Sequence, residues 1–114
     1  MTTVGVGAVS GVTADEVLAA VDAVLVAGTE DVRLATLDVR ALEPGIASAA
    51  GTRGWPVTGY SATELAAVAV PSPSGRVGDL VGTPSVAEAA ALLEGGTLLV
   101  GKTVVGRVTV AVSA

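Results

Sequence analysis

Three helix-start signals set the order in which this chain can form its secondary structure. Each is a capping box, in which a Ser or Thr is followed three residues later by Glu, and they lie at residues 13–16, 61–64 and 85–88. Apolar, β-branched runs lie before the first box and after the last one. Strands and helices should therefore alternate, which favours an α/β fold with a helix-covered sheet.

The expected elements follow from these starts and from the apolar periodicity. Strands are expected at residues 3–8, 32–38, 97–101 and 105–112, with an extended stretch at 55–58. Helices are expected from Thr13 to about Ala27, at 45–50 and 61–67, and from Pro84 to about Leu93, with one or two turns at 76–81. The last two strands are close enough in sequence to form an antiparallel hairpin. Residues 1–114 are thus predicted to form one domain, a three-layer α/β/α fold with a mixed sheet and a C-terminal β-hairpin.

The composition limits the core to small aliphatic side chains. Hydrophobic residues make up 51% of the chain, yet it has one Trp, one Tyr and no Phe, so Val, Leu and Ala must fill the interior. The net charge is −5, and the six Lys and Arg residues are spread along the chain without a basic stripe or an aromatic platform. Nucleic acid is therefore not an expected partner.

Missing residue types exclude several classes of site. The chain has no Cys and no His, which removes thiolate nucleophiles, Ser-His and Cys-His pairs, disulfides and the usual protein ligands of zinc and cobalt. We therefore expect no metal site and no cofactor of the protein's own. No apolar stretch approaches the roughly 20 residues of a membrane span. No basic-then-apolar segment opens the sequence either, so a cytoplasmic protein without a membrane partner is expected.

One literal motif match must be set aside. Residues 96–103 fit the phosphate-loop pattern G-x-x-x-x-G-K-[ST], with Gly101, Lys102 and Thr103 at its end. The pattern binds phosphate only when a strand precedes the loop and a helix follows it. Here the variable positions are typical of a strand and a second β-branched run follows, so Lys102 should lie in or beside a strand-to-strand connection.

The glycines within residues 5–11 follow a strand and precede a helix, which is the setting of a dinucleotide or anion site. The third glycine is one residue late for G-x-G-x-x-G, and no acidic residue closes the next strand about 20 residues further on. A dinucleotide is thus disfavoured. Two hypotheses stay open: Gly5 and Gly7 contact an anionic ligand, or they serve only to form a turn.

Polar residues gather where the second strand is expected to end. Thr36, Asp38 and Arg40 alternate, so they should share one side of an extended segment, and Glu43 follows in the loop. Open α/β sheets bind ligands at the carboxyl ends of their strands, so a carboxylate and a guanidinium here could orient a substrate. The alternative is a surface ion pair that contributes little. Neither acid is paired in a way that specifies acid–base catalysis, and catalytic residues stay unassigned.

Hydroxyl side chains lie beside the prolines in the later half of the chain. They are those of Ser72, Ser74, Thr83 and Ser85. They could donate to a ligand next to free amides at helix starts, although capping alone also explains them. Lys102 similarly has two interpretations, a ligand contact or a charge that protects an edge strand from aggregation.

The order of these pieces resembles one family. The resemblance covers nearly the full length and rests on "LATLDVRALEPGI" (34–46), "VAVPSPSGRVGDLVGTPSVAEAAALL" (68–93), the isolated Lys102 and the final "TVAVSA" (109–114). Among these, "VGTPSVAEAAALL" is the most specific stretch. The chain is similar to CobE and to the C-terminal domain of CbiG, which belong to cobalamin biosynthesis.

This resemblance implies a function in handling corrinoid intermediates. CbiG proteins are cobalt-precorrin-5A hydrolases, which open a δ-lactone and release acetaldehyde, and this chain resembles only their C-terminal part. The leading hypothesis is a protein that binds a precorrin or cobalt-precorrin intermediate and assists its conversion or transfer. Two others are the C-terminal half of a split hydrolase and a non-catalytic module that docks on a pathway enzyme. The low number of charges is also compatible with a homodimer.

The resemblance also implies which residues contact the ligand. By position it points to Gly5, Gly7, Thr36, Glu43, Pro73, Ser74, Gly82, Thr83, Pro84, Ser85 and Lys102. A precorrin has an apolar face and many carboxylates, so its site should offer amide donors, hydroxyls and one or two cations. Any cobalt would be held by the macrocycle. The chain departs from the family at Ala8-Val9-Ser10, where the family has a Cys and basic residues, and at Arg40, where it usually has Lys.

Overall fold

A computed structural model describes residues 2–9, 11–26, 28–67, 86–93 and 96–114. Its five-stranded sheet has the order β3-β2-β1-β5-β4. The strands are β1 (Thr2–Ala8), β2 (Val32–Leu37), β3 (Val57–Tyr60), β4 (Leu98–Val105) and β5 (Val108–Ser113). The first three are parallel, whereas β5 runs antiparallel to both β1 and β4. The mixed sheet and the C-terminal hairpin expected from the sequence are confirmed.

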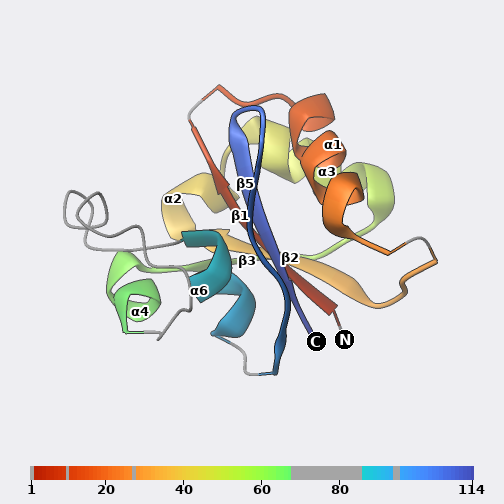
Figure 1. The fold of residues 1–114 in the computed structure, drawn as a ribbon. Helices are drawn as coiled ribbons and strands as arrows, with labels where there is room; N and C mark the ends of the chain where they lie inside the picture. Colours follow the sequence, from red (N-terminus) through yellow and green to blue (C-terminus); the bar gives the residue numbers. More distant parts are fainter. Residues whose placement is uncertain (1, 10, 27, 68–85, 94–95) are drawn as a thin grey trace.

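Helices cover both faces of this sheet. Figure 1 views the sheet nearly edge-on, with α1 (Ala14–Val24) and α3 (Pro44–Arg53) on one side and α4 (Ala62–Ala66) and α6 (Val86–Leu92) on the other. The short α2 (Asp38–Ala41) follows β2 directly. The three-layer α/β/α architecture is therefore confirmed. Among the described residues, no helix has the length and apolar character needed to cross a membrane.

The two faces of the sheet are packed differently. Toward α1 and α3, the alternating valines of β1 and β5 form the main core, together with Leu34 and Ile46. Toward α6, the sheet presents Gly5, Ala35 and Ala111, which are all buried. A Cβ added at Gly5 would lie 1.8 Å from the carbonyl oxygen of Ala87, so the backbone of α6 lies directly on β1. Small residues thus allow a close-packed seam between the sheet and α6, formed by Gly5, Ala35 and Ala111 on the sheet and by the backbone of α6.

The two capping boxes that lie within the described residues are confirmed. Thr13 and Ser61 each cap their helix in a complete capping box, with Glu16 and Glu64 as the partners. Ser85, the first residue of the third box, lies outside the described residues, and α6 is described from Val86.

Two helix ends differ from expectation for local reasons. Helix α1 ends at Val24, not near Ala27, because Thr29 bonds the carbonyl of Val26 through both its hydroxyl (2.5 Å) and its amide (3.1 Å) and forms a competing turn. Helix α3 runs three residues beyond the expected end, to Arg53. It stops only at Gly54, whose φ of 71° provides the left-handed cap.

The expected alternation of Thr36, Asp38 and Arg40 along one strand is wrong. The pairing of β1 with β2 ends at Thr36, and the pairing of β2 with β3 ends one residue later at Leu37. Asp38 then begins α2, and its Oδ1 accepts the N–H of Val39 at 2.7 Å. An acidic residue in the first turn suits the positive end of a helix, so the chain leaves the sheet there.

The turn of the hairpin lies later than expected. Strand β4 continues to Val105, and the turn is formed by Gly106, with φ of 60°, and Arg107. The Gly-Lys-Thr of the phosphate-loop pattern therefore lies inside a strand and is followed by another strand. Lys102 belongs to β4 and not to a connection, and β4 forms one edge of the sheet.

Candidate functional site

A long-range hydrogen bond joins α2, which follows β2, to the carboxyl end of β1. Arg40 on α2 donates from Nε to the carbonyl oxygen of Ala8, the last residue of β1, at 3.0 Å. The turn from β2 into α2 makes this contact possible, because it brings the guanidinium back across the end of the neighbouring strand. Arg40 is thus positioned at the edge where open α/β sheets bind ligands.

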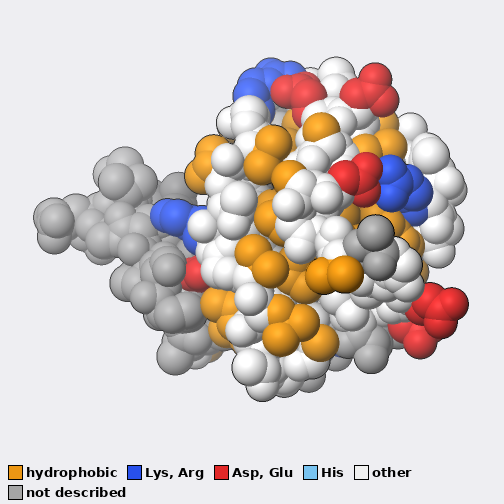
Figure 2. Space-filling model, turned by 45° about the vertical axis from the view of Figure 1, so that its right-hand side comes forward, with side chains coloured by type: hydrophobic (Ala, Val, Ile, Leu, Met, Phe, Trp, Pro, Cys, Tyr) orange, Lys and Arg blue, Asp and Glu red, His pale blue; other side chains and the backbone are white. Residues whose placement is uncertain are grey.

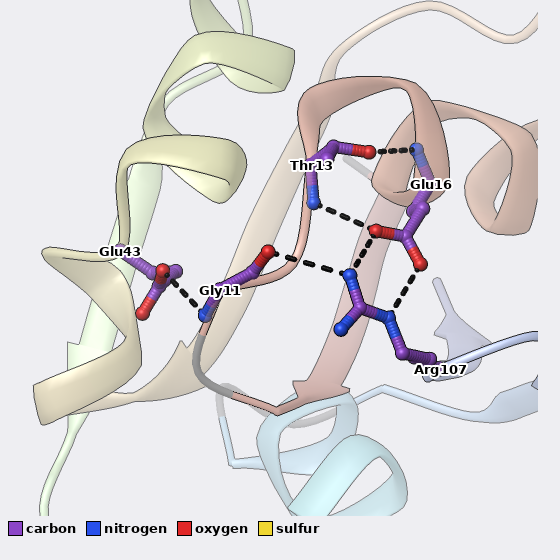
Figure 3. Close-up of polar contacts among 5 residues, drawn as sticks. All are labelled: Gly11, Thr13, Glu16, Glu43 and Arg107. Atoms are coloured by element: carbon purple, nitrogen blue, oxygen red, sulfur yellow. Dashed lines mark hydrogen bonds and ion pairs between the residues drawn. The ribbon is translucent and has the colours of Figure 1, made fainter.

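Glu43 anchors the connection between β1 and α1. It lies in the N-cap position of α3 but does not cap that helix with its side chain. Its Oε1 instead accepts the N–H of Gly11 at 3.0 Å (Figure 3). The backbone of Gly11 has φ of 86°, which favours glycine at this turn.

The same connection is bonded by Arg107 of the hairpin turn. Arg107 donates to both carboxylate oxygens of Glu16, at 2.7 and 2.5 Å, and to the carbonyl oxygen of Gly11 at 3.3 Å (Figure 3). The hydrogen bonds from Arg107 to the Glu16 carboxylate, with a further one from the Thr13 amide, lower the pKa of Glu16 to about 2. The start of α1 is therefore connected to both α3 and the β4–β5 turn.

Three amides around the start of α1 are already bonded within the protein. Gly11 donates to Glu43, Thr13 to Glu16, and Glu16 to the hydroxyl of Thr13. A ligand carboxylate could reach the Gly11 amide only by displacing Glu43. Of the two glycines in β1, Gly5 is buried beneath α6, while Gly7 lies half-buried beside Val86. The described role of Gly5 is close packing.

Exposed apolar side chains lie close in sequence to the two residues of the Arg40–Ala8 contact. Val39 and Leu42 flank Arg40 in sequence, and Val9 follows Ala8. Leu42 is 83% exposed, Val39 60% and Val9 48%. These four residues, Val9, Val39, Arg40 and Leu42, are called the carboxyl-edge surface below. They combine apolar area with a guanidinium, which suits a ligand that has both an apolar face and carboxylates.

Thr36 and Asp38 are separated by the end of β2. Thr36 is fully buried, and its hydroxyl donates to the carbonyl oxygen of Val6 at 2.7 Å. It joins β2 to β1 from the α1 and α3 side of the sheet. Asp38 is exposed at the start of α2. Only Asp38 of this pair is therefore accessible beside the carboxyl-edge surface.

Lys102 lies on the opposite edge of the sheet from β3, and a buried acid contacts its backbone. The amide of Lys102 donates to Oε2 of Glu88 at 2.8 Å, and Glu88 is fully buried on α6. From the sequence alone, Glu88 is expected only as the capping partner of Ser85. One signal was present, because the segment 86–93 is apolar all round and a Glu within it has little solvent-facing surface available.

Several predicted residues lie outside the described part of the chain. They are Ser72, Pro73, Ser74, Gly82, Thr83, Pro84 and Ser85. Among the residues that are described, no group of three or more His, Cys, Asp or Glu side chains could hold a metal ion.

The fold and its edges define a three-layer α/β domain with a mixed sheet and a polar-and-apolar surface at the carboxyl ends of its parallel strands. The chain matches the family described as Cobalamin synthesis G C-terminus over residues 2–113, and it belongs to that family. Its role therefore lies in cobalamin biosynthesis.

Two crystal structures are similar to the fold over nearly its whole length. CobE, a protein from the cobalamin (vitamin B12) biosynthetic pathway, has 26% sequence identity and a TM-score of 0.84, with 99% of this chain and 92% of CobE covered. The cobalamin biosynthesis protein chiG from Agrobacterium tumefaciens str. C58 has 36% identity and a TM-score of 0.75, with 99% and 97% covered. No curated protein sequence matches the chain.

Proposed function

We propose that this domain binds a carboxylate-rich tetrapyrrole, a precorrin or cobalt-precorrin intermediate, and assists its conversion or transfer. Family membership over residues 2–113 supports the pathway. The observation that carries the binding proposal is the carboxyl-edge surface, where Val39 and Leu42, close to Arg40 in sequence, are both exposed. The apolar side chains would contact the macrocycle, while Arg40 would pair with one of its carboxylates.

The test is a titration followed through the visible spectrum of the ligand. The probe is cobyrinic acid, a corrin whose peripheral side chains end in carboxylates. The control is its methyl ester, whose side chains carry no charge. Leu42→Ser removes apolar area from the proposed surface without disturbing the core, because Leu42 is 83% exposed. Val26→Ser is the matched control, since Val26 is 77% exposed just beyond the other end of α1.

We expect the wild type to bind the acid more tightly than the ester, and Leu42→Ser to weaken binding roughly tenfold, which corresponds to about 1.4 kcal/mol of lost apolar contact. Val26→Ser should bind as the wild type does. Equal effects of the two Ser variants would place the ligand elsewhere. A folded wild type that binds neither probe would refute the proposed function.

The family's description as a C-terminus favours a second candidate, the C-terminal half of a split cobalt-precorrin-5A hydrolase. This candidate predicts that the domain and a separate N-terminal partner together release acetaldehyde from cobalt-precorrin-5A. An alcohol dehydrogenase would report acetaldehyde through the oxidation of NADH. Release that is the same with and without this domain would exclude the second candidate.

A further inference from the structure

A buried carboxyl group on α6 contacts the backbone of β4. Glu88 is 0% exposed, although acidic side chains are almost never fully buried unless they are paired. Its Oε2 accepts the amide hydrogen of Lys102 at 2.8 Å. The contact joins α6 to β4 across the face of the sheet.

The contact falls at a β-bulge. Val100 lies opposite Val112 and Thr103 lies opposite Val110, so the two residues Gly101 and Lys102 oppose the single residue between their partners on β5. A β-bulge is defined by this arrangement, and bulges frequently re-aim side chains beside functional sites.

Side-chain packing along β4 confirms the bulge. Val100 and Val105 both pack against the core on the α1 and α3 side. They are five positions apart and would point to opposite faces in a regular strand, where side chains alternate. One extra residue between them restores the common face. The bulge is therefore needed for Val100 and Val105, on either side of it, to pack against the same core.

The local sequence is adapted to the approach of the carboxylate. A Cβ added at Gly101 would lie 3.2 Å from Oε2 of Glu88, which is tighter than an ordinary contact. Glycine at this position leaves room for Glu88 to reach the next amide. Lys102 itself is exposed, as are the apolar side chains of Leu99 and Val104 on the same strand. Figure 2 brings forward the side of the molecule on which α1 lies in Figure 1. Apolar side chains gather through the centre of this view, and charged side chains lie mainly toward its rim.

We infer that Glu88 is a positioning residue for Lys102: its buried carboxylate holds the Gly101–Lys102 bulge and thereby fixes where the Lys102 ammonium meets a carboxylate of the ligand. The inference rests on the proposed function for the identity of the ligand and adds Lys102, on the β4 edge, as a second cation that pairs with it. The hold on the bulge is a property of the protein alone. Two measurements separate these two parts.

The first measurement needs no ligand. Hydrogen exchange of individual amides by NMR is compared for the wild type, Glu88→Ala and Glu88→Gln. Loss of the carboxylate should speed exchange of the Lys102 amide at least about tenfold, with a smaller effect for Gln, which keeps a neutral acceptor. Ser113→Ala is the matched control, because the Ser113 hydroxyl bonds the Ala91 carbonyl and also joins α6 to the sheet. It should leave the Lys102 amide unchanged.

The second measurement is a double-mutant cycle with cobyrinic acid as the probe. Glu88→Gln and Lys102→Met should each weaken binding, by about threefold and about tenfold respectively, and Glu88→Gln should add nothing in the Lys102→Met background. A purely structural role for Glu88 would weaken binding by the same factor in both backgrounds. Binding of the methyl ester should not respond to either substitution.

The outcomes separate the two proposals. Unchanged Lys102 exchange in both Glu88 variants overturns the hold on the bulge. Faster exchange with additive effects on binding overturns the positioning role. If the wild type binds neither probe, the proposed function and the positioning role fail together, while the exchange data still decide whether Glu88 holds the bulge. If Glu88→Ala does not fold, Glu88→Gln alone gives both measurements.

Discussion

Substitution of Gly5 by Ala tests the close packing of α6 on the sheet. The new Cβ would lie 1.8 Å from the carbonyl oxygen of Ala87 and 2.8 Å from the backbone nitrogen of Ala91. Both obstacles are backbone atoms of one helix, so no side chain can rotate away. Carbon atoms pack best at about 3.5–4.0 Å, and α6 would have to move outward by roughly 1.5–2 Å.

Such a movement should cost about 3 kcal/mol or more of the free energy of unfolding. Overpacking in a tight core typically costs about 1–3 kcal/mol, and backbone obstruction on the helix side places this site at the upper end. A gap of even 0.5–1 Å forfeits roughly a quarter to a half of each dispersion contact. The buried alanines of α6, Ala87, Ala89, Ala90 and Ala91, would all lose such contacts.

Gly7→Ala is the matched control for this prediction. Gly7 lies two residues further along β1 on the same face, and its added Cβ would have its nearest neighbour at an ordinary 3.6 Å. This substitution should be neutral or stabilise the protein by up to about 1 kcal/mol, because alanine restricts the unfolded chain. In urea denaturation, Gly5→Ala should lower the midpoint by about 1–3 M relative to the wild type. Midpoints for the two variants that agree within error would refute the reasoning about α6.

Two further predictions concern polar contacts. The pKa of Glu16 is lowered from 4.5 to about 2, so the stabilisation by its pair with Arg107 is present above about pH 4.5 and is lost as the pH falls toward 2. Thermal melts at about pH 6 and about pH 2.5 should therefore differ more for the wild type than for Arg107→Gln, and an equal difference would contradict the assignment. Thr36→Val removes a buried hydroxyl that donates to Val6 and should cost about 1–2 kcal/mol in urea denaturation. Thr103→Val removes an exposed hydroxyl and should cost near zero, so equal losses would count against the Thr36 bond.

Helix starts could be predicted from the sequence because each capping box is complete within four residues. Thr13 with Glu16 and Ser61 with Glu64 close the same reciprocal hydrogen bonds in the fold as in the sequence pattern. The C-terminal hairpin could also be predicted from a short stretch of sequence, because its two β-branched runs lie almost adjacent. Such features need no knowledge of the rest of the molecule.

The departures arise from contacts between distant residues. Alternation around Thr36 gave no sign that β2 would end at Leu37, because the end depends on where β1 and β3 stop pairing. The contact between Arg40 and Ala8 joins residues 32 positions apart, and the one between Arg107 and Gly11 joins residues 96 positions apart. No local pattern encodes such partners, so the residues of the candidate site could be proposed but not their contacts.

Helix α6 links the small residues of the sheet to the Gly101–Lys102 bulge, because it packs on the former and bonds the latter through Glu88. Gly5 on β1 and Ala111 on β5 are small, which lets the helix lie against the sheet, and Glu88 directly follows Ala87, the residue that meets Gly5. A methyl group at Gly5 should therefore act at a distance, because moving α6 outward would also withdraw Glu88 from Lys102 on β4. We expect Gly5→Ala to speed exchange of the Lys102 amide although β5 lies between the two strands, whereas Gly7→Ala should leave it unchanged. Faster exchange throughout β4 and β5 would instead indicate general loosening, and an unaffected Lys102 amide in a destabilised Gly5→Ala protein would show that Glu88 does not depend on the packed seam.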